Sequence, residues 1–479
     1  MRENQLKVLF VSSEVSPFVK TGGLGDVAGA LPYALKKSGI DIRVVMPKYK
    51  SIPAEFTKDF KSKADFPVFL DWRKHKASIY EYNKDLPVYF IGNDYYFDRE
   101  DLYSYEDDHE RFAFFCKAVL KMLIRIDFIP DIIHCNDWQT GPIPLLLKEN
   151  YHDDSFYNSI LTLFTIHNLQ YQGIFGKESL RILGVPDWYF NPEHIEFYGN
   201  INYMKAGLQY SDAISTVSKT YAREIMTKEY GYGLEGILQK RSQKLYGIVN
   251  GIDYKLYNPE SDDSLYVKYS PDKIELKEEN KKALQKELNL PQKDVPLISI
   301  ISRLVEQKGF DLIAEQMDEL MKEDIQMIIL GTGEERYERL FSHMEERFPE
   351  KVRAKIYFDL DLAQKIYGGS DLFLMPSLFE PCGLGQLISL RYGTIPVVRH
   401  TGGLADTIEE FNKETASGNG FVFNEYNSYA MLAAIRRAIA AYHDKESWKK
   451  LIRNAMASNH SWEDSAKEYL NLYKELASK

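Results

Sequence analysis

Buried-strand patterns alternate with amphipathic helical patterns through most of the 479-residue chain. The strand patterns are short apolar or β-branched runs, in two series separated by a turn-rich passage at 244–259. The clearest amphipathic helix is predicted over 110–124. Continuous apolar strands between helices are typical of parallel sheets covered by helices on both faces. The predicted strands are 7–11, 41–47, 86–92, 131–135, 161–167 and 212–218, then 295–301, 325–330, 354–358, 371–376, 394–398 and 420–423.

The two strand series predict an α/β chain. A prior of about 150 residues per domain allows two or three domains at this length, and the turn-rich passage places the division near 245–252. The domains are therefore predicted as 1–248 and 249–459, with a closing helical segment over 460–479. The Lys- and Glu-rich stretch 268–294 is interpreted as a solvated helix with charge pairs four residues apart.

The composition excludes several classes of protein. Hydrophobic residues make up 44% of the chain, which is enough for large cores and argues against disorder. No apolar run approaches the roughly 18 residues that suggest a membrane span, and the N-terminus lacks a signal-peptide pattern. The net charge of −10 argues against nucleic-acid binding. The three cysteines form no CxxC pair and no HExxH occurs, so we predict no metal, no cofactor and a cytoplasmic location.

A glycine turn occurs twice, as TGGLGD at 21–26 and TGGLAD at 401–406, each after a strand and before a helical pattern. In open parallel sheets, ligands bind beyond the carboxyl ends of the strands. The backbone N–H groups of Gly22 and Gly23 can approach a phosphate closely because no Cβ intervenes, and Lys20 adds a positive charge. The alternative is a tight turn with a solvated lysine.

A dinucleotide-binding site is the weaker interpretation of the first turn. Residues 23–28 match G-x-G-x-x-A. In a dinucleotide-binding unit, however, the first glycine follows its strand directly and an acidic residue ends the second strand. Here about eleven residues separate the strand from Gly23, and Asp41 begins the second strand instead of ending it. A nicotinamide or flavin dehydrogenase is therefore disfavoured.

The second half carries stronger signals for an anionic ligand. Arg303 and Lys308 follow the strand 295–301 and open a helix, which suits a diphosphate, although two surface cations are the alternative. The run 376–386 places Glu380 and several glycines at another strand-to-helix junction, where helix N-terminal amides favour phosphate. Cys382 as a nucleophile is disfavoured, because no nearby histidine would activate its thiol.

Seven motifs together resemble the bacterial glycogen synthases and plant starch synthases of glycosyltransferase family 5. The resemblance implies a GT-B fold, with two Rossmann-like domains whose parallel sheets face a deep interdomain cleft, and a C-terminal helix crossing back to the first domain. It implies retaining transfer of glucose from ADP-glucose to the non-reducing end of an α-1,4-glucan such as glycogen, without a metal. The motifs are KTGGLGDV (20–27), HCNDW (134–138), TIHNLQYQG (165–173), VNGID (249–253), SRLVEQKG (302–309), PSLFEPCGLGQL through RYGT (376–394) and TGGLAD (401–406).

The same resemblance implies the roles of five catalytic residues. Glu380 would bind the glucose hydroxyls, and His167 would contact the transferred glucose. Asp137 would shape the sugar pocket, although it could simply cap a helix. Arg303 and Lys308 would hold the diphosphate from the C-terminal domain.

The substrate-binding residues implied by the resemblance lie in both domains. Lys20 and the glycine amides beside it would reach the diphosphate, and Asn250 would shape the sugar pocket. Phe358 stands where some relatives have a tyrosine near the adenine, so stacking would survive without the hydroxyl contact. The full set is Lys20, Gly22, Gly23, Asn250, Phe358, Cys382, Gly383, Leu384 and Gly402, the last beside the distal phosphate.

Retention by double displacement requires a carboxylate nucleophile about 5 Å from its acid/base partner. The sequence offers no obvious pair, and Ile388 occupies the place of a second glutamate found in some other retaining relatives. We therefore expect attack from the face that the leaving group vacates. The alternatives to this enzyme are a glucan- or nucleotide-binding protein without catalysis and a synthase that prefers UDP-glucose.

Overall fold

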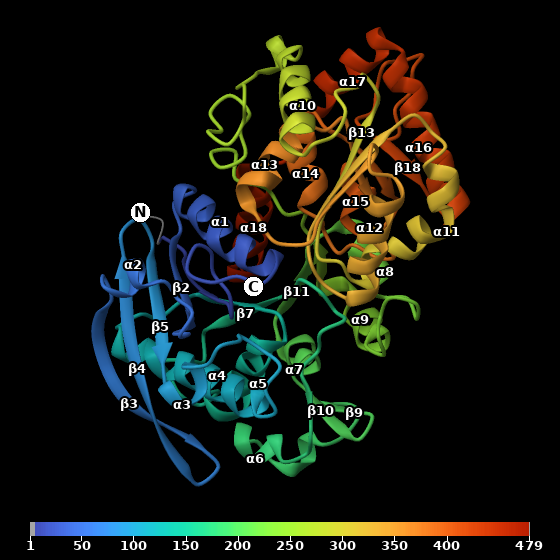
Figure 1. Ribbon diagram of the computed structural model, residues 1–479. Coiled ribbons are helices and arrows are strands. Elements are labelled where there is room, and N and C mark those ends of the chain that lie inside the picture. The colour runs from blue at the N-terminus through green and yellow to red at the C-terminus, as the bar shows by residue number, and fades with distance from the viewer. Residues whose placement is uncertain (1–4, 479) are drawn as a thin grey trace. The chain divides into compact units, whose positions relative to one another are not determined.

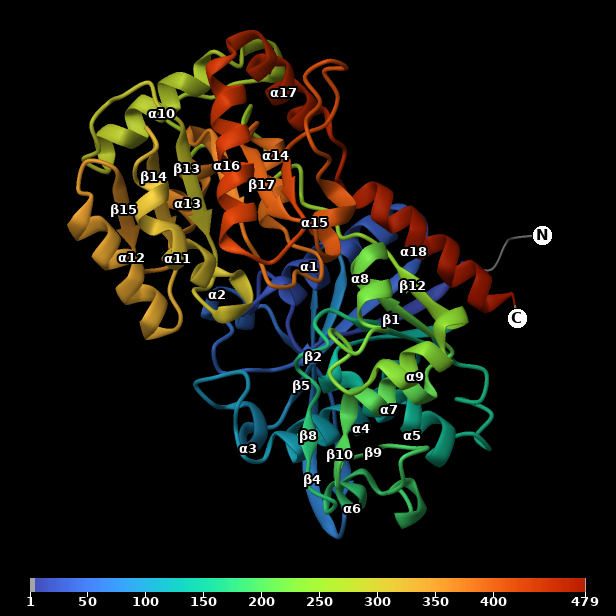
Figure 2. The ribbon, with the colours of Figure 1, turned by 90° about the vertical axis from the view of Figure 1, so that its right-hand side faces the viewer.

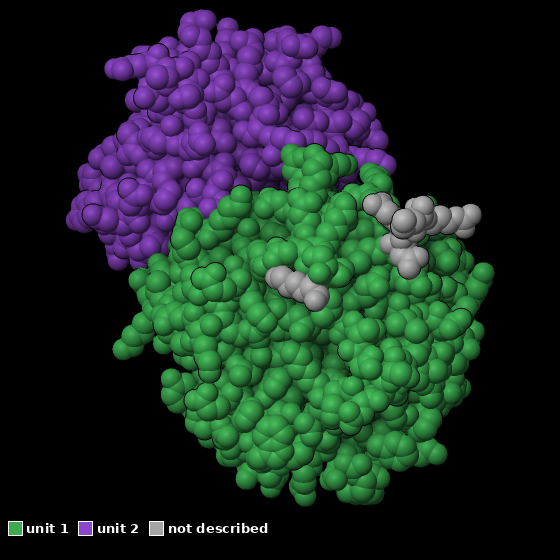
Figure 3. All heavy atoms as spheres, turned by 180° about the vertical axis from the view of Figure 1, so that it is seen from behind, with its two compact units in different colours: residues 1–250, 462–479 green, residues 251–461 purple. Residues whose placement is uncertain are grey.

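A computed structural model describes residues 5–478 of the chain, which form two compact units (Figure 3). Unit 1 contains the described residues up to Asn250 together with those from Trp462 onward, and unit 2 is Gly251–Ser461. Along the chain, the first division follows residue 250 where the sequence predicts 248, and the second follows 461 where it predicts 459. No helix among residues 5–478 is long and apolar enough to cross a membrane.

Hydrogen bonds explain why the divisions lie where they do. The Val249 carbonyl accepts a bond of 2.7 Å from the Ser465 hydroxyl, which lies in the C-terminal helix of unit 1. The next contact belongs to unit 2, where the Ile252 N–H donates to the His460 carbonyl at 2.9 Å. Val249 and Asn250 therefore belong to unit 1 and not, as predicted, to the second domain.

Unit 1 is built on a sheet whose described strands run in the order β12-β11-β7-β6-β1-β2-β5-β4-β3 (Figure 1). The first seven of these are parallel neighbours. The strands are β1 (Lys7–Val11), β2 (Asp41–Pro47), β3 (Lys61–Leu70), β4 (Arg73–Asn83), β5 (Pro87–Gly92), β6 (Ile132–Asn136), β7 (Leu161–Ile166), β11 (Ala213–Thr216) and β12 (Leu245–Gly247). A small antiparallel sheet contains β8 (Ile174–Phe175), β9 (Glu196–Phe197) and β10 (Asn200–Asn202).

The helices of unit 1 include the closing segment of the chain, because α18 packs against α1. His134 in β6 bonds to the hydroxyl of Tyr473 in α18 at 2.7 Å, deep in the core. The helices are α1 (Gly23–Lys37), α2 (Ala54–Thr57), α3 (Asp94–Phe97), α4 (Asp108–Arg125), α5 (Pro142–Asn150), α6 (Ser179–Leu183), α7 (Tyr203–Tyr210), α8 (Lys219–Glu224), α9 (Glu235–Lys240) and α18 (Trp462–Ala477).

The hairpin β3–β4 was missed by the sequence analysis, which predicted only parallel strands. Both strands alternate exposed and buried residues, as in the pattern of KSKADFPVFL. Alternation is typical of antiparallel strands with one solvated face, whereas the analysis sought the continuous apolar runs of parallel strands. The hairpin pairs antiparallel with β5 and extends the edge of the sheet (Figure 1).

Unit 2 contains an all-parallel sheet of described strands in the order β15-β14-β13-β16-β17-β18 (Figure 2). Its strands are β13 (Leu297–Ile301), β14 (Gln326–Leu330), β15 (Val352–Lys355), β16 (Leu372–Met375), β17 (Ile395–Arg399) and β18 (Phe421–Phe423). Its helices are α10 (Leu276–Glu287), α11 (Phe310–Leu320), α12 (Glu335–Arg347), α13 (Leu360–Gly369), α14 (Gly385–Arg391), α15 (Gly402–Thr407), α16 (Ser428–His443) and α17 (Lys445–Ala457).

In each unit the parallel strands reverse their order along the sheet at one point, and this point marks the loops that are candidates for a site. In unit 2 the order reverses between β13 and β16, and in unit 1 it reverses between β1 and β6. In open α/β sheets, ligands bind outside the carboxyl ends of the strands at such a reversal. The loop after β13 carries Arg303 and Lys308, and the loop after β16 carries Glu380. In unit 1, the loop after β6 begins with Asp137, and the loop after β1 carries Lys20.

Candidate active site

In unit 2, the loops after β13 and β16 meet through an ion pair. The ammonium of Lys308 lies 2.6 Å from Oε2 of Glu380, and the Ser377 hydroxyl donates to the same oxygen at 3.1 Å. The Glu380 side chain is 7% exposed and that of Lys308 is 17% exposed. The second oxygen, Oε1, makes no hydrogen bond to any residue that the structure describes. It is therefore available to accept a bond from a ligand.

Backbone contacts hold these two loops together. The Leu378 N–H donates to the Gln307 carbonyl at 2.9 Å, and the Gln307 amide donates to the Phe379 carbonyl at 3.2 Å. Gly309 adopts φ +71°, and a Cβ there would lie 2.0 Å from the Pro376 carbonyl. Only glycine permits this approach, so the SRLVEQKG motif is shaped to pack against the loop that carries Glu380.

The second glycine turn packs against the main chain of the same loop. Gly402 adopts φ +45°, and a Cβ there would lie 1.9 Å from the Glu380 carbonyl. The Gly403 N–H donates to that carbonyl at 3.0 Å. The predicted contact of Gly402 with a phosphate stays a prediction, while its contact with Glu380 gives the TGGLAD repeat a positioning role.

A buried glutamine orients two peptide groups, the one that joins Cys382 to Gly383 and the one that joins Gly383 to Leu384. The Gln386 side-chain amide donates to the carbonyls of Cys382 at 3.0 Å and Gly383 at 2.9 Å. Leu384 is the N-cap residue of α14. Sequence reasoning missed Gln386, although its place in the first turn of a helix behind a glycine run was a usable signal.

Two predicted site residues of unit 2 are exposed. The Arg303 side chain makes no hydrogen bond or ion pair to the part of the chain that the structure describes, so its guanidinium is available for an anion. The strand predicted over 354–358 ends earlier, at Lys355, and Phe358 follows it with 73% of its surface exposed. A ring this exposed has both faces accessible for stacking.

In unit 1, His167 follows β7 and its ring is held by Asn136 at the end of β6. The Asn136 amide donates to the carbonyls of Val11 at 3.0 Å and His134 at 3.3 Å, so its Oδ1 must accept from Nε2 of His167 at 2.9 Å. Burial lowers the pKa of His167 to about 3. The neutral ring therefore carries its proton on Nε2, which leaves Nδ1 as an acceptor.

Asp137 lies beside His167, in a backbone conformation that residues other than glycine rarely adopt. Its φ is +55° and its ψ is 179°. Its Oδ1 accepts the His167 N–H at 2.7 Å. Burial raises the pKa of Asp137 to about 7, against the lowering by the N–H groups of His167 and Asn168. A strained residue with a shifted pKa at the sheet reversal is a functional candidate.

In the first glycine turn, one of the N–H groups predicted to bind phosphate has a partner within the protein. The Gly22 N–H, predicted to bind phosphate, donates to Oε2 of Glu14 at 3.3 Å. Lys20 pairs with Asp26 at 2.7 Å, and Gly23 begins α1. Asn250 is 5% exposed, and its Oδ1 has no hydrogen-bond partner among the described residues. In this unit the Gly22 N–H is thus taken by Glu14 and the Lys20 ammonium by Asp26, while Oδ1 of Asn250 is available to a ligand.

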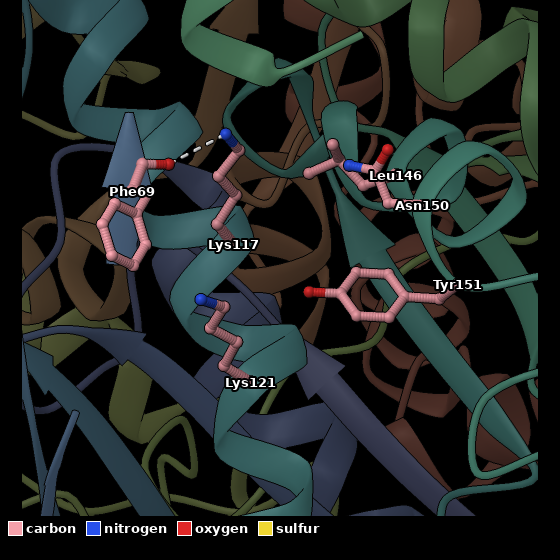
Figure 4. A pocket seen from close by; sticks show the side chains of 6 residues that line it. All are labelled: Phe69, Lys117, Lys121, Leu146, Asn150 and Tyr151. Atoms are coloured by element: carbon pink, nitrogen blue, oxygen red, sulfur yellow. Dashed lines mark hydrogen bonds between the residues drawn. The ribbon is translucent and has the colours of Figure 1, made fainter. Parts of the chain in front are cut away.

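A separate cavity of about 190 Å³ lies against α4 and α5, and none of the predicted site residues lines it (Figure 4). Its lining residues are Phe69, Lys117, Lys121, Leu146, Asn150 and Tyr151. The Lys117 ammonium donates to the carbonyls of Phe69 and Ile182. Among the described residues, no group of three or more His, Cys, Asp or Glu is arranged to hold a metal ion.

The family model described as the starch synthase catalytic domain matches residues 7–240, and the model for glycosyl transferases group 1 matches residues 280–457. A glycogen synthase of Desulforudis audaxviator is 54% identical over 100% of this chain and 98% of its own length. One from Clostridioides difficile is 52% identical over 98% of this chain and 100% of its own.

The chain belongs to the glycogen and starch synthase family. It is a glycosyltransferase of glycogen synthesis, as the resemblance implied. The catalytic domain of Arabidopsis thaliana starch synthase IV, solved with ADP and acarbose, has a TM-score of 0.93 at 34% identity, covering 99% of this chain and 100% of that one. A sucrose-phosphate synthase of Thermosynechococcus elongatus shares the fold, with a TM-score of 0.63 at 17% identity over 99% and 100% of the two chains. The predicted GT-B fold is confirmed.

The raised pKa of Asp137 predicts a pH-dependent effect of Asp137→Asn on stability. Because the folded pKa of about 7 lies above the usual value near 4, stability from this group is fully present below about pH 4 and is lost as the pH rises through 7. In the Asp137→Asn variant this loss does not occur, because asparagine does not ionise. Its Oδ1 can still accept the His167 N–H. We therefore expect the difference in melting temperature, variant minus wild type, to increase from pH 4 to pH 8. A difference that stays constant over this range would contradict the burial of this carboxyl.

Proposed function

We propose that this chain transfers glucose from ADP-glucose to the non-reducing end of an α-1,4-glucan, with retention of configuration and release of ADP. The observation that carries the proposal is the meeting of Lys308 and Glu380 at the strand reversal of unit 2, with the free guanidinium of Arg303 on the same loop as Lys308. The related starch synthase solved with ADP and acarbose supports a nucleotide and a glucan as the two ligands.

The donor is held by residues with different tasks. Arg303 and Lys308 bind the diphosphate, and they stabilise the negative charge that develops on the departing ADP. Each preorganised donor of this kind typically lowers a barrier by about 3–4 kcal/mol, although such contributions are not additive. Phe358 offers its exposed ring to the adenine. The amides of Cys382, Gly383 and Leu384 face the phosphates in this proposal, and Gln386 fixes the peptide planes that carry the last two.

Each unit by itself offers sugar hydroxyls acceptors whose geometry is fixed. Oε1 of Glu380 accepts bonds from the glucose hydroxyls, while Oε2 stays with Lys308 and Ser377. In unit 1, Nδ1 of His167 is the acceptor that its tautomer leaves available, and the unpartnered Oδ1 of Asn250 is a second one. No nucleophilic carboxylate is assigned, so a departing phosphate oxygen takes the proton of the attacking glucan hydroxyl on the same face.

The donor assay tests the proposal directly. With glycogen as acceptor, we expect a kcat/KM for ADP-glucose at least about tenfold above that for UDP-glucose, a difference of about 1.4 kcal/mol. Activity is expected to persist in excess EDTA. Lysine and arginine neutralise the negative charge of the phosphates, which a metal would otherwise do. Equal or reversed ratios would reject the donor assignment, and loss in EDTA restored by a divalent ion would reject the cation account.

A cytoplasmic location belongs to the same proposal. Its support is that Cys116, Cys135 and Cys382 are buried and form no disulfide, as expected of a protein from a reducing compartment. Fractionation of the source cells with antibody detection tests it, and recovery outside the cytoplasmic fraction would overturn it.

A further inference from the structure

Glu14 lies in the loop after β1, and no role assigned above uses it. Its side chain is buried, with 4% of the residue exposed. Its carboxylate accepts four hydrogen bonds, from the Thr21 N–H at 2.6 Å, the Thr21 hydroxyl at 2.7 Å, the Gly22 N–H at 3.3 Å and the Tyr103 hydroxyl at 2.8 Å. Three of these four bonds come from the glycine turn that follows Lys20.

The carboxylate occupies the place where a helix start attracts an anion. Helix α1 begins at Gly23, and the N–H of its N-cap residue Gly22 has no partner within the helix. From the loop after β1, Glu14 supplies the acceptor for that N–H and for the N–H of Thr21. Charge-assisted bonds of this kind are roughly twice as strong as neutral ones. The turn is therefore fixed by a residue that precedes it in the chain and lies at the reversal of the sheet.

The same turn sets the position of Lys20. A Cβ on Gly25 would lie 2.4 Å from Cβ of Lys20 and 3.4 Å from Oε2 of Glu14, so the lysine stem, the helix start and the carboxylate are packed in close contact. The Lys20 ammonium bonds to Asp26 in the first turn of α1. Movement of the turn would therefore move the ammonium with it.

Glu14 forms no ion pair with any described residue, since the nearby Lys20 pairs with Asp26. A buried carboxylate without a cation partner is costly to keep. Here four hydrogen-bond donors, three of them from the turn, surround the carboxylate in place of a cation. The geometry of the turn therefore depends on the acceptor that Glu14 supplies.

We propose that Glu14 is a positioning residue, which holds the turn of Lys20, Thr21 and Gly22 so that the Lys20 ammonium meets the diphosphate of the donor. By occupying the amides of Thr21 and Gly22, it leaves Lys20 as the main diphosphate contact of this turn. The inference rests on the proposed function, because it needs a nucleotide-sugar donor with a diphosphate.

The test is a double-mutant cycle with Glu14→Ala and Lys20→Ala, assayed with whichever nucleotide sugar the wild type uses best. Glu14→Ala removes the acceptor of both N–H groups, whereas Glu14→Gln can turn its amide oxygen to these N–H groups and its NH₂ group to the hydroxyls of Thr21 and Tyr103. A misplacement of about 1 Å can cost about 100-fold in rate, so we expect kcat to fall about 100-fold in Glu14→Ala and to recover to within about tenfold of wild type in Glu14→Gln. Because Glu14 acts through Lys20, the double variant should be no slower than Lys20→Ala alone.

Tyr103→Phe is the matched control, since it removes one bond to Glu14 and none from the turn, and it should keep kcat within about twofold of wild type. Hydrogen exchange of the peptide 20–25 gives a readout that needs no activity and should be at least about tenfold faster in Glu14→Ala. Additive losses of kcat in the cycle, or unchanged exchange in this peptide, would overturn the positioning role. A wild type that turns over no nucleotide sugar would instead reject the proposed function, while the exchange measurement would still decide whether Glu14 holds the turn.

Discussion

Glu380→Gln is expected to lower kcat by about 10²- to 10³-fold, the usual cost of losing one electrostatic contact made to a transition state. The substitution keeps the shape and an acceptor for the Ser377 hydroxyl, but it removes the charge that faces the sugar and pairs with Lys308 at 2.6 Å. Positive charge develops on the glucose ring as ADP leaves, so the loss falls on kcat. The KM for the donor should change only a few-fold, as measured by ADP release with glycogen as acceptor.

Cys382→Ser is the control for this prediction, because it changes the neighbouring side chain and keeps the backbone. The Cys382 carbonyl is held by Gln386 at 3.0 Å, and a Cβ on Gly403 would lie 2.1 Å from it, so the main chain is fixed independently of the thiol. Substantial turnover should remain. A Cys382→Ser enzyme that binds ADP normally but is inactive would revive the cysteine as a nucleophile, and a fully active Glu380→Gln would remove Glu380 from the site.

The sequence predicted the parallel framework of both units because buried parallel strands have a local signature. Runs such as KVLFV and IQMIIL are apolar on both faces, and the structure forms strands over them. The loops after β13 and β16 were also predictable, because a glycine turn or a proline after an apolar run marks where a strand ends. The family resemblance then added the roles that local patterns alone do not assign.

The partners of the predicted residues could not be read from the sequence, because they depend on contacts between distant segments. Asn136 and His167 are 31 residues apart, and Glu380 and Lys308 are 72 apart. Glu14 lies next to two serines in the sequence and looks like an ordinary loop residue until the turn folds back on it. The φ of +55° at Asp137 was equally invisible, since aspartate has no local pattern that demands it.

Lys308→Ala is expected to weaken ADP binding more than Arg303→Ala does. Removing the exposed Arg303 takes away one cation, but removing Lys308 also leaves the buried Glu380 carboxylate without its partner and turns it against the incoming diphosphate. Breaking a buried ion pair costs about 3 kcal/mol or more of folding stability. For a unit of this size that corresponds to a fall of roughly 6–12 °C in melting temperature.

The double variant Lys308→Ala with Glu380→Gln separates stability from function. Removing both charges eliminates the unpaired carboxylate, so the melting temperature should recover toward that of wild type while turnover stays lost. Calorimetric ADP titration should place its affinity between those of Lys308→Ala and wild type, because the repulsion is gone but the cation is still missing. If the double variant is as unstable as Lys308→Ala, or if Lys308→Ala binds ADP as well as wild type does, the ion pair is not the element that joins the phosphate and sugar contacts of unit 2.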